Sequence, residues 1–384
     1  MSKQEIDWSQ EKTKHFQEDF LNWYHLAKRN LPWRATNDPY AIWISEIMLQ
    51  QTRVDTVIGY YYRFMEEFPT IQALADAEEQ KLLKVWEGLG YYSRARNLKA
   101  AAQQIVAIYH GQMPMTMDDI RSLKGIGPYT AGAIGSIAFG LPEPAIDGNV
   151  MRVVSRLFCS DADIAKASSR PVFDQKMRHL MPERDTGAFN QAFMDLGSSI
   201  CTPTSPKCEE CPISQYCLAY AENKQTQYPV KTKKPKAKDV YFVAGAIEDN
   251  GSFLLTQRGD TGLLASMWHF PLREVTKSEY QELASLWEKD DQPGQIDLIA
   301  EESTPTIFSD LPVIWQKRHF GEVTHLFTHL KWHILLFYGV KRTSFSVESG
   351  RWVPESAFDA FVFPKPQQKL VAQLKKYQKL DKDF

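Results

Sequence analysis

The stretch of sequence that decides the fold reads Leu-Lys-Gly-Ile-Gly-Pro-Tyr-Thr-Ala over residues 123–131. A short helix is predicted before it, over Met117–Leu123, and a second, apolar helix begins near Tyr129. Gly125 and Gly127 permit a sharp turn and the close approach of another backbone. The unpaired amides at the start of the second helix can hold a phosphate oxygen without reading a base. The segment therefore predicts a helical hairpin that contacts a phosphate backbone, and simple helix packing is the alternative.

The spacing of apolar residues and the composition change after the helical part of the chain. Up to about Leu218 the apolar residues recur at helical spacing, and strand-like alternation is nearly absent. Residues 225–239 hold five lysines around Pro235 and read as a linker. Beyond it, Val240–Ile247 and Phe253–Gln257 flank a turn and predict a β-hairpin.

The sequence thus predicts a multidomain protein with an all-α domain over residues 1–224 and an α+β domain over residues 240–384, joined by the linker over residues 225–239. Further elements are expected in the second domain: a helix at Lys277–Lys289, strands between Val323 and Val340, and a last helix at Pro366–Leu380.

The composition is that of an ordinary globular protein. Of 384 residues, 43% are hydrophobic and 24% are charged, and no apolar run is long enough to span a bilayer. The formal net charge is −2, so any nucleic-acid site must be local. The segment Met1–Phe20 lacks the apolar stretch of a signal peptide, and we expect a cytoplasmic protein without a membrane segment.

Four of the five cysteines are crowded into one loop. Cys201, Cys208, Cys211 and Cys217 are separated by six, two and five residues, and the prolines between them exclude a regular helix or strand. Four thiolates on an irregular loop can hold one soft metal ion or an iron–sulfur cluster. Because the spacing alone does not choose between them, a structural zinc site is the alternative. Cys159 stands apart and is expected to be a buried core thiol.

Two carboxyl groups lie in surroundings that suit a general acid and a stabilising anion. Glu46 lies on the apolar face of a probable helix, where desolvation favours the protonated form. Asp147 precedes another helix, which it could simply cap. A protonated carboxyl group beside an ionised one is the arrangement that cleaves glycosidic bonds. The structural alternative for Glu46 is an ion pair with Arg34 or Arg53.

Taken together, these motifs resemble the endonuclease III superfamily of helix–hairpin–helix glycosylases, and within it the MutY family of adenine glycosylases. The resemblance covers nearly the whole chain. It implies a [4Fe–4S] cluster on the four cysteines and a double-stranded DNA substrate with A:8-oxoguanine or A:G mispairs, and we expect a monomer. The segments that carry it are residues 31–34, 45–52, 86–92, 123–131, 146–150 and 201–217.

The resemblance also implies roles for the residues of the adenine site. In the family, the glutamate that matches Glu46 protonates adenine, and the aspartate that matches Asp147 stabilises the sugar cation. Tyr129 stands where strand-cleaving relatives carry a lysine that forms a Schiff base, which a phenol cannot do. A monofunctional glycosylase that leaves an abasic site is therefore expected. Arg34 and Asn149 are expected at the adenine pocket, although packing or capping would explain either residue.

Adenine must leave the base stack before it can react, and something must fill the gap. By resemblance, Gln51, Thr52, Leu89 and Tyr91 belong to that wedge and to the contact with 8-oxoguanine. Without the resemblance, Leu89 and Tyr91 would be assigned to the core.

The second domain resembles the Nudix fold in residues 267–271 and 325–329. Nudix hydrolases bind metal through a helix that carries Arg-Glu and Glu-Glu pairs. No such box follows Pro271, and Ser278-Glu279-Tyr280-Gln281-Glu282 does not fit it, so the domain is expected to bind and not to hydrolyse. Thr328 stands where many relatives have serine, so its added methyl group must fit. Thr328 and His329 are expected to contact the lesion base.

Three rival functions are weighed against this interpretation. One is a bifunctional glycosylase and lyase similar to endonuclease III, against which Tyr129 speaks. Another is a non-catalytic iron–sulfur protein that only binds DNA, for which Glu46 and Asp147 would be dispensable. The third is nucleotide hydrolysis by the second domain, which would require a magnesium-dependent pyrophosphatase activity.

Overall fold

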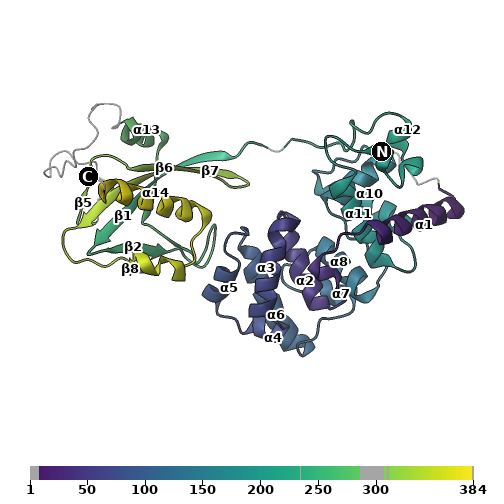
Figure 1. The fold of residues 1–384 in the computed structure, drawn as a ribbon, viewed down its shortest axis with the longest axis horizontal. Coiled ribbons are helices and arrows are strands. Elements are labelled where there is room, and N and C mark those ends of the chain that lie inside the picture. The colour runs from purple at the N-terminus through teal and green to yellow at the C-terminus, as the bar shows by residue number, and fades with distance from the viewer. Residues whose placement is uncertain (1–7, 234, 286–306, 309–310, 383–384) are drawn as a thin grey trace. The chain divides into compact units, whose positions relative to one another are not determined.

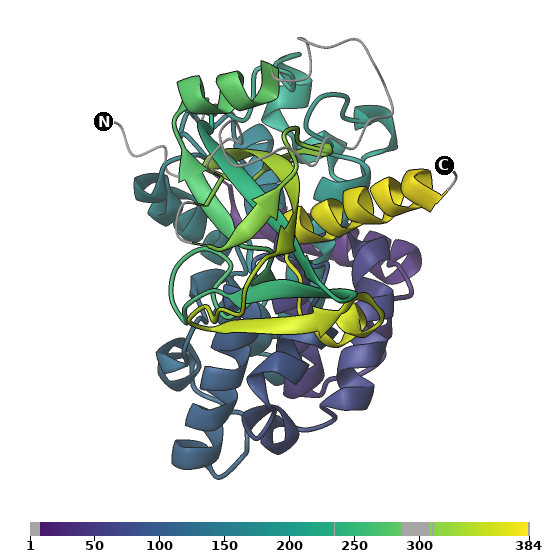
Figure 2. The same ribbon diagram turned by 90° about the vertical axis from the view of Figure 1, so that its left-hand side faces the viewer.

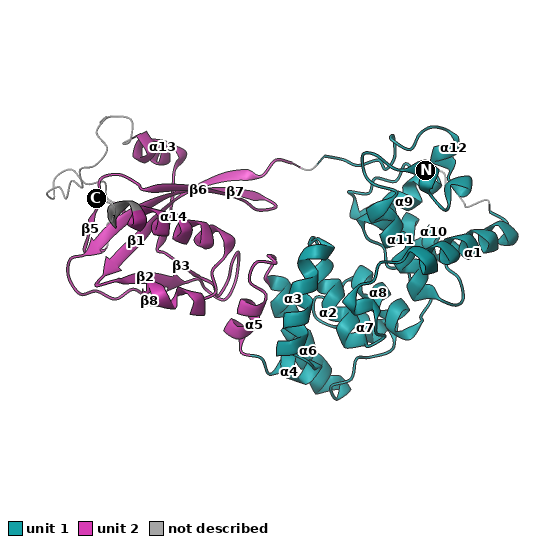
Figure 3. Ribbon diagram, in the orientation of Figure 1, with its two compact units in different colours: residues 1–77, 93–234 teal, residues 78–92, 235–384 magenta. Residues whose placement is uncertain are grey.

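The computed structural model describes residues 8–233, 235–285, 307–308 and 311–382, and the chain divides into two compact units (Figures 1 and 3). The first contains Met1–Ala77 and Ser93–Lys234, and the second contains Glu78–Tyr92 and Pro235–Phe384. The segment Glu78–Tyr92 therefore groups with the second unit, although it lies in the range expected for the helical domain. Within the described ranges, no helix has the length and apolar character needed to cross a membrane.

The first unit is built from helices, as the spacing of apolar residues predicts. The expected hairpin is present as α7 (Met117–Ser122) and α8 (Pro128–Phe139). The other α-helices described in this unit are α1 (Gln10–Ala27), α2 (Pro39–Leu49), α3 (Val54–Glu67), α4 (Ile71–Ala75), α6 (Ser93–Tyr109), α9 (Gly148–Leu157), α10 (Arg170–Leu180), α11 (Thr186–Ser199) and α12 (Leu218–Ala221).

Local chemistry sets the turn between α7 and α8. Thr116 caps α7 by accepting a hydrogen bond from the amide of Asp119 at 3.3 Å. Gly125 has a φ of 75°, and a Cβ there would lie 2.6 Å from the Cβ of Asn97, so only glycine fits. Gly127 is the N-cap of α8, and Pro128 occupies the first turn, where its missing N–H costs nothing.

An aromatic core joins α1 to α11. Phe16 and Phe20 of α1 pack on Phe189 and Phe193 of α11, with ring centroids 4.9 to 6.4 Å apart. The apolar side of α9 belongs to the same core, and so does Ile213 from the cysteine loop. The loop that carries the four cysteines is therefore anchored on the same core as α9.

The first part of the predicted linker is ordered against the first unit. The amide of Ile164 donates to the carbonyl of Val230 at 3.0 Å. The amide of Thr232 donates to the carboxylate of Asp163 at 3.1 Å. These hydrogen bonds hold the linker as far as Thr232, six residues before β1 begins at Lys238.

The second unit contains a mixed sheet of eight described strands. The predicted hairpin is confirmed, because Glu248 pairs with Phe253 between antiparallel β1 and β2. The central pair, β1 and β7, is parallel. The strands are β1 (Lys238–Asp249), β2 (Ser252–Gln257), β3 (Trp268–His269), β4 (Leu272–Val275), β5 (Val313–Trp315), β6 (Gly321–Leu326), β7 (Leu330–Lys341) and β8 (Gly350–Pro354).

Neighbouring side chains of β1 and β7 point to opposite faces of the sheet, and a helix of the described residues packs on each face. Phe242 and Ile334 lie in the core that α14 (Lys365–Lys382, the long yellow helix in Figure 2) completes. Val243 lies in the opposite core, against α13 (Lys277–Ser285). The predicted helix at 277–289 therefore begins where expected, and its last four residues lie outside the described residues.

The segment Glu78–Tyr92, which includes α5 (Glu79–Val85), is held on the second unit by hydrogen bonds. The ammonium group of Lys84 donates to the carbonyl of Phe361 at 3.0 Å. The carboxylate of Glu87 accepts from the amide of Phe363 at 2.8 Å. Both contacts reach the chain that leads from β8 to α14.

Close packing in the first unit sets the position of Asp147. A Cβ on Gly132 of α8 would lie only 2.2 Å from the carbonyl oxygen of Pro144. The amide of Ala145 donates to the side chain of Asn190 at 3.0 Å, which holds the same stretch from the other side. Because Asp147 follows two residues after Ala145, this close packing helps to fix the stretch of backbone that leads to it.

We expect Gly132→Ala to destabilise the protein by about 1–3 kcal/mol, because the added methyl group forces a backbone to move. Gly59→Ala in α3 is the matched control. No atom of another part of the chain lies within 4 Å of a Cβ at Gly59, and alanine favours the helix. Urea unfolding followed by circular dichroism measures both variants, and equal stability would contradict the packing argument.

Candidate active site

Glu46 and Tyr129 form a hydrogen-bonded pair inside the helical unit. Glu46 of α2 is 5% exposed, and the hydroxyl of Tyr129, the second residue of α8, donates to its Oε2 at 2.6 Å. Burial raises the pKa of Glu46 to about 7, and the nearby Asp147 adds to the rise, against the opposing hydrogen bond from Tyr129 and charge of Arg34. Burial likewise raises the pKa of Tyr129. This carboxyl group can therefore carry a proton near neutral pH.

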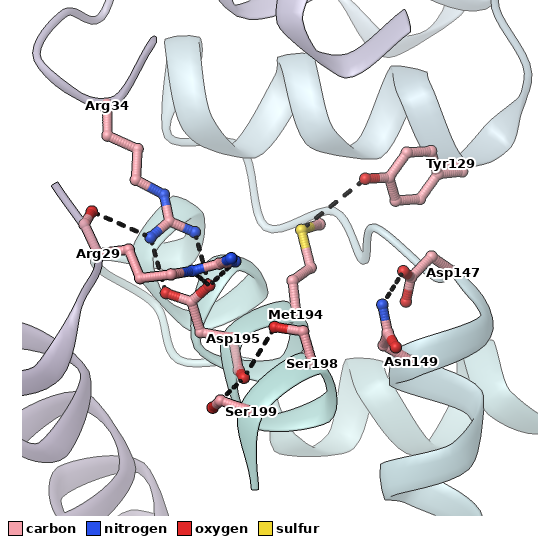
Figure 4. Close-up of polar contacts among 9 residues, drawn as sticks. All are labelled: Arg29, Arg34, Tyr129, Asp147, Asn149, Met194, Asp195, Ser198 and Ser199. Atoms are coloured by element: carbon pink, nitrogen blue, oxygen red, sulfur yellow. Dashed lines mark hydrogen bonds and ion pairs between the residues drawn. The ribbon is translucent and has the colours of Figure 1, made fainter. Parts of the chain in front are cut away.

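The predicted alternative of an ion pair for Glu46 does not occur among the described residues. Arg34 instead donates to both carboxylate oxygens of Asp195, at 2.7 and 3.0 Å (Figure 4). Arg53 is exposed and lies at the N-cap of α3. Although burial opposes it, the hydrogen bonds and charges of Arg34 and Arg29 hold the pKa of Asp195 below its ordinary value.

Asp147 is the N-cap of α9, as its sequence setting allowed. Its Oδ1 accepts from the amide of Val150 at 2.7 Å, and its Oδ2 accepts from the side-chain amide of Asn149 at 2.8 Å. Burial raises the pKa of Asp147, while these hydrogen bonds and the charge of Arg152 oppose the rise. Capping fixes the carboxyl group in one orientation and leaves it able to stabilise a cation, so the two interpretations are compatible.

Asn149 connects this carboxyl group to the cysteine loop. The Oδ1 of Asn149 accepts from Nη2 of Arg152 at 2.8 Å. Nε of Arg152 donates to the carbonyl of Cys201 at 2.8 Å. A chain of hydrogen bonds therefore runs from Asp147 to the first of the four cysteines.

Sequence reasoning missed two neighbours of the site, both on α11. The sulfur of Met194 lies 3.8 Å from the hydroxyl of Tyr129. The carboxylate of Asp195 holds Arg34 and also Arg29, whose Nε donates at 3.0 Å (Figure 4). The sequence signal that could have identified Asp195 is its place in a mostly apolar helix, because a carboxylate buried there needs a cation close by.

The predicted DNA-facing residues of the first unit lie at the ends of helices. Gln51 is exposed and has a φ of 59°, directly after Gln50, the C-cap of α2, and Thr52 follows it half-buried. Gly125 and Gly127 are exposed in the turn before α8. The first intrahelical bond of α8 runs from Ala131 to Gly127 at 2.9 Å. The amide of Tyr129 therefore precedes the helical hydrogen bonds, as an anion site requires.

The structure brings Tyr91 together with Thr328 in the second unit. The hydroxyl of Tyr91 and Oγ1 of Thr328 are 2.9 Å apart. Tyr91 is 46% exposed, whereas Leu89 is buried at 6% exposed, so only Leu89 has the burial of a core residue. Thr328 and His329 are exposed between β6 and β7, and the neighbouring Phe327 anchors this turn by donating its amide to the carbonyl of Leu330 at 2.7 Å.

The four loop cysteines influence one another electrostatically. Burial raises the pKa of Cys211 to about 12 and that of Cys217 to about 11, and Cys201 and Cys208 add to both shifts. Backbone hydrogen bonds from Ile213 and Tyr220 oppose these rises. Among the described residues, no three His, Cys, Asp or Glu side chains could hold a single metal ion as they stand. Outside the loop, Cys159 is buried at 8% exposed, as predicted.

Comparison with protein families accounts for both units and for the loop. Residues 44–177 match the HhH-GPD superfamily of base excision DNA repair proteins, residues 242–373 match the NUDIX domain, and residues 201–217 match the iron-sulfur binding domain of endonuclease III. The cysteine loop therefore holds a [4Fe–4S] cluster, and thiolate side chains are its usual ligands.

Individual relatives agree with these matches. The chain is 35% identical to the adenine DNA glycosylase of Mus musculus over 82% of this chain and 68% of that one. It is 38% identical to the adenine DNA glycosylase of Buchnera aphidicola subsp. Schizaphis graminum over 67% of this chain and 74% of that one. Among solved structures, a thermostable thymine-DNA glycosylase is similar at a TM-score of 0.51 and 30% identity, over 55% of this chain and 98% of that one.

These findings confirm the predicted fold, a helix–hairpin–helix glycosylase domain with an iron–sulfur loop followed by a Nudix-like domain, and they identify an enzyme of base excision repair. The chain belongs to the adenine DNA glycosylase family.

Proposed function

We propose that this protein removes adenine mispaired with 8-oxoguanine or guanine in double-stranded DNA and leaves an abasic site. The observation that carries the proposal is the buried Glu46, bonded to Tyr129 and electrostatically influenced by the fixed carboxyl group of Asp147. That the base removed is adenine is inferred from the names of the relatives.

Glu46 is the general acid of this mechanism. With a pKa of about 7, it holds a proton in a large fraction of molecules at neutral pH. It passes this proton to adenine as the bond between base and sugar breaks, which makes the base a better leaving group. The hydroxyl of Tyr129 orients the acid by its hydrogen bond at 2.6 Å.

Asp147 is the anion that stabilises the sugar as positive charge develops on it. The two carboxyl groups raise each other's cost of ionisation, so the pair favours one proton over none. Glu46 is the more buried of the two and takes this proton. Donors from Asn149 and Val150 favour the ionised form of Asp147.

Tyr129 makes the enzyme monofunctional. A lyase needs an amine that attacks the sugar and forms a Schiff base, and the phenol at this position cannot form one. Borohydride added during turnover should therefore trap no adduct of protein and DNA. A trapped adduct would favour the bifunctional alternative.

Six residues are assigned to the gap that adenine leaves and to the orphaned base. Gln51, Thr52, Leu89 and Tyr91 fill the space that adenine leaves. Thr328 and His329, exposed on the turn between β6 and β7, contact the opposite base. The hydrogen bond between Tyr91 and Thr328 supports this assignment, because it joins a wedge residue to a base-reading residue.

Arg34 and Asn149 border the adenine pocket, and the exposed Gly125 and Gly127 hold a DNA phosphate. Cys201, Cys208, Cys211 and Cys217 would hold the [4Fe–4S] cluster, which anchors the loop and takes no part in the base removal described here. The enzyme acts as a monomer in the cytoplasm, where thiols remain reduced.

Asp147→Asn should abolish adenine release, with a loss of at least about 1,000-fold, because a neutral amide cannot stabilise the sugar cation. Asparagine is also a good N-cap, so the fold should persist. The measurement is a single-turnover assay on A:8-oxoguanine duplexes, followed by alkali to reveal abasic sites. Asp174→Asn, which removes an exposed carboxylate on α10, is the control. Normal turnover by Asp147→Asn would refute the mechanism.

The single-turnover rate should fall as pH rises through about 7, because Glu46 then loses the proton that it must donate. Tyr129→Phe removes a hydrogen bond that lowers the pKa of Glu46. The falling limb should therefore move to higher pH in that variant. Rates measured from pH 5 to pH 9 in both proteins test this prediction. A limb that stays in place or moves to lower pH would contradict the assigned acid.

Thr328→Val should reduce the preference for A:8-oxoguanine over A:G duplexes by about tenfold, because one hydrogen-bonding hydroxyl is lost. Thr328→Ser keeps the hydroxyl and should behave as the parent protein does. Thr324→Val, an exposed exchange of the same kind on β6, is the control. Rates on A:8-oxoguanine, A:G and A:C duplexes give the comparison. An unchanged preference in Thr328→Val would remove this residue from the base-reading site.

A further inference from the structure

Arg156 contacts a cysteine sulfur, the cysteine loop and the linker at once. The side chain is 2% exposed in the last turn of α9. Its Nη1 donates to Sγ of Cys201 at 3.2 Å and to the carbonyl of Thr202 at 2.7 Å. Its Nη2 donates to the carbonyl of Pro203 at 3.0 Å, and its Nε donates to the carbonyl of Tyr228 at 3.0 Å.

A buried guanidinium group needs negative charge close by. Three of the acceptors of Arg156 are neutral carbonyl groups, and none of its partners in the described part of the chain is a carboxylate. The C-terminal end of α9 contributes part of a charge. Sγ of Cys201 would supply negative charge when it ligates the cluster, because a cysteine that ligates a metal is a thiolate.

The neighbouring buried arginine of α9 makes different contacts. Arg152 donates to the backbone carbonyls of Cys201 and Gly197 and to the side chain of Asn149, at 2.7 to 2.8 Å. Arg152 therefore contacts the adenine site and the backbone of the loop, whereas Arg156 contacts the ligand sulfur itself.

The fourth contact of Arg156 joins the loop to the linker. Tyr228 lies at the start of the linker, whose next residues are held by Ile164 and Asp163. The same guanidinium thus orders the path by which the chain leaves the helical unit and fixes the first cluster ligand.

We infer that Arg156 is a positioning residue that holds Cys201 as a cluster ligand and couples the cluster loop to the linker. Loss of the contact to the sulfur weakens the hold on the cluster. Loss of the contact to Tyr228 removes one of the hydrogen bonds that hold the linker on the first unit and loosens it.

The test uses the full-length, cluster-loaded protein with Arg156→Met, which keeps the apolar stem and removes every donor. Iron should be lost to a chelator about 10- to 100-fold faster, as for other residues that support metal ligands. The reduction potential of the cluster on DNA should become more negative, because a hydrogen bond to sulfur favours the reduced form. Trypsin should cut after Lys231 and Lys233 faster than in the parent.

Two further variants separate the effect of a positive charge near the loop from the effects of the contacts to the sulfur and to Tyr228. Lys207→Met removes an exposed cation of the same loop and should leave all three readouts unchanged. Arg156→Lys keeps the charge but cannot reach the sulfur and Tyr228 together, so its potential should be closer to the parent value while its linker is cut as fast as in Arg156→Met. Arg156→Lys also carries the test if Arg156→Met does not fold.

Parental rates of iron loss and of cleavage in Arg156→Met would overturn the inference. Fast iron loss with parental cleavage would overturn the coupling, and fast cleavage with parental iron loss and potential would overturn the role at the sulfur. None of these readouts uses the base-removal reaction, so their outcome is independent of the proposed function.

Discussion

The free-energy cost of burying charge governs the arrangement of the helical unit. Asp195 remains ionised because Arg34 and Arg29 donate to its carboxylate. Glu46 has a phenol as its hydrogen-bond partner and no ion pair in the described structure, and the pKa of its carboxyl group rises to about 7. Helices of one bundle thus hold one carboxyl group charged and another ready to give up a proton. Burial raises the pKa of both groups, and the two arginines beside Asp195 outweigh that effect there.

The local parts of this design could be predicted from the sequence. The glycine turn between α7 and α8, the N-cap at Asp147 and the first β-hairpin each depend on residues close together in the chain, whose conformational preferences act without the rest of the fold. The apolar face around Glu46 belongs to the same class, because helical spacing alone places its neighbours.

The partners of the site residues could not be predicted, because they come from distant parts of the chain. Arg34 and Asp195 are 161 residues apart, and Glu46 and Tyr129 are 83 residues apart. The pattern around Arg34 allowed a pair with Glu46 equally well. Its choice of Asp195 depends on how α11 packs against α1 and α8, which no local rule encodes.

The grouping of Glu78–Tyr92 with the second unit has a topological consequence. The chain passes between the units three times, at residues 77–78, 92–93 and 234–235, and not once as in two domains joined by a single tether. A tether alone would let the second unit diffuse freely within its reach. Here, Lys84 and Glu87 also bond the segment Glu78–Tyr92 to the chain before α14, within the second unit. A protease cut in the linker would therefore sever one of these three crossings and leave the other two intact.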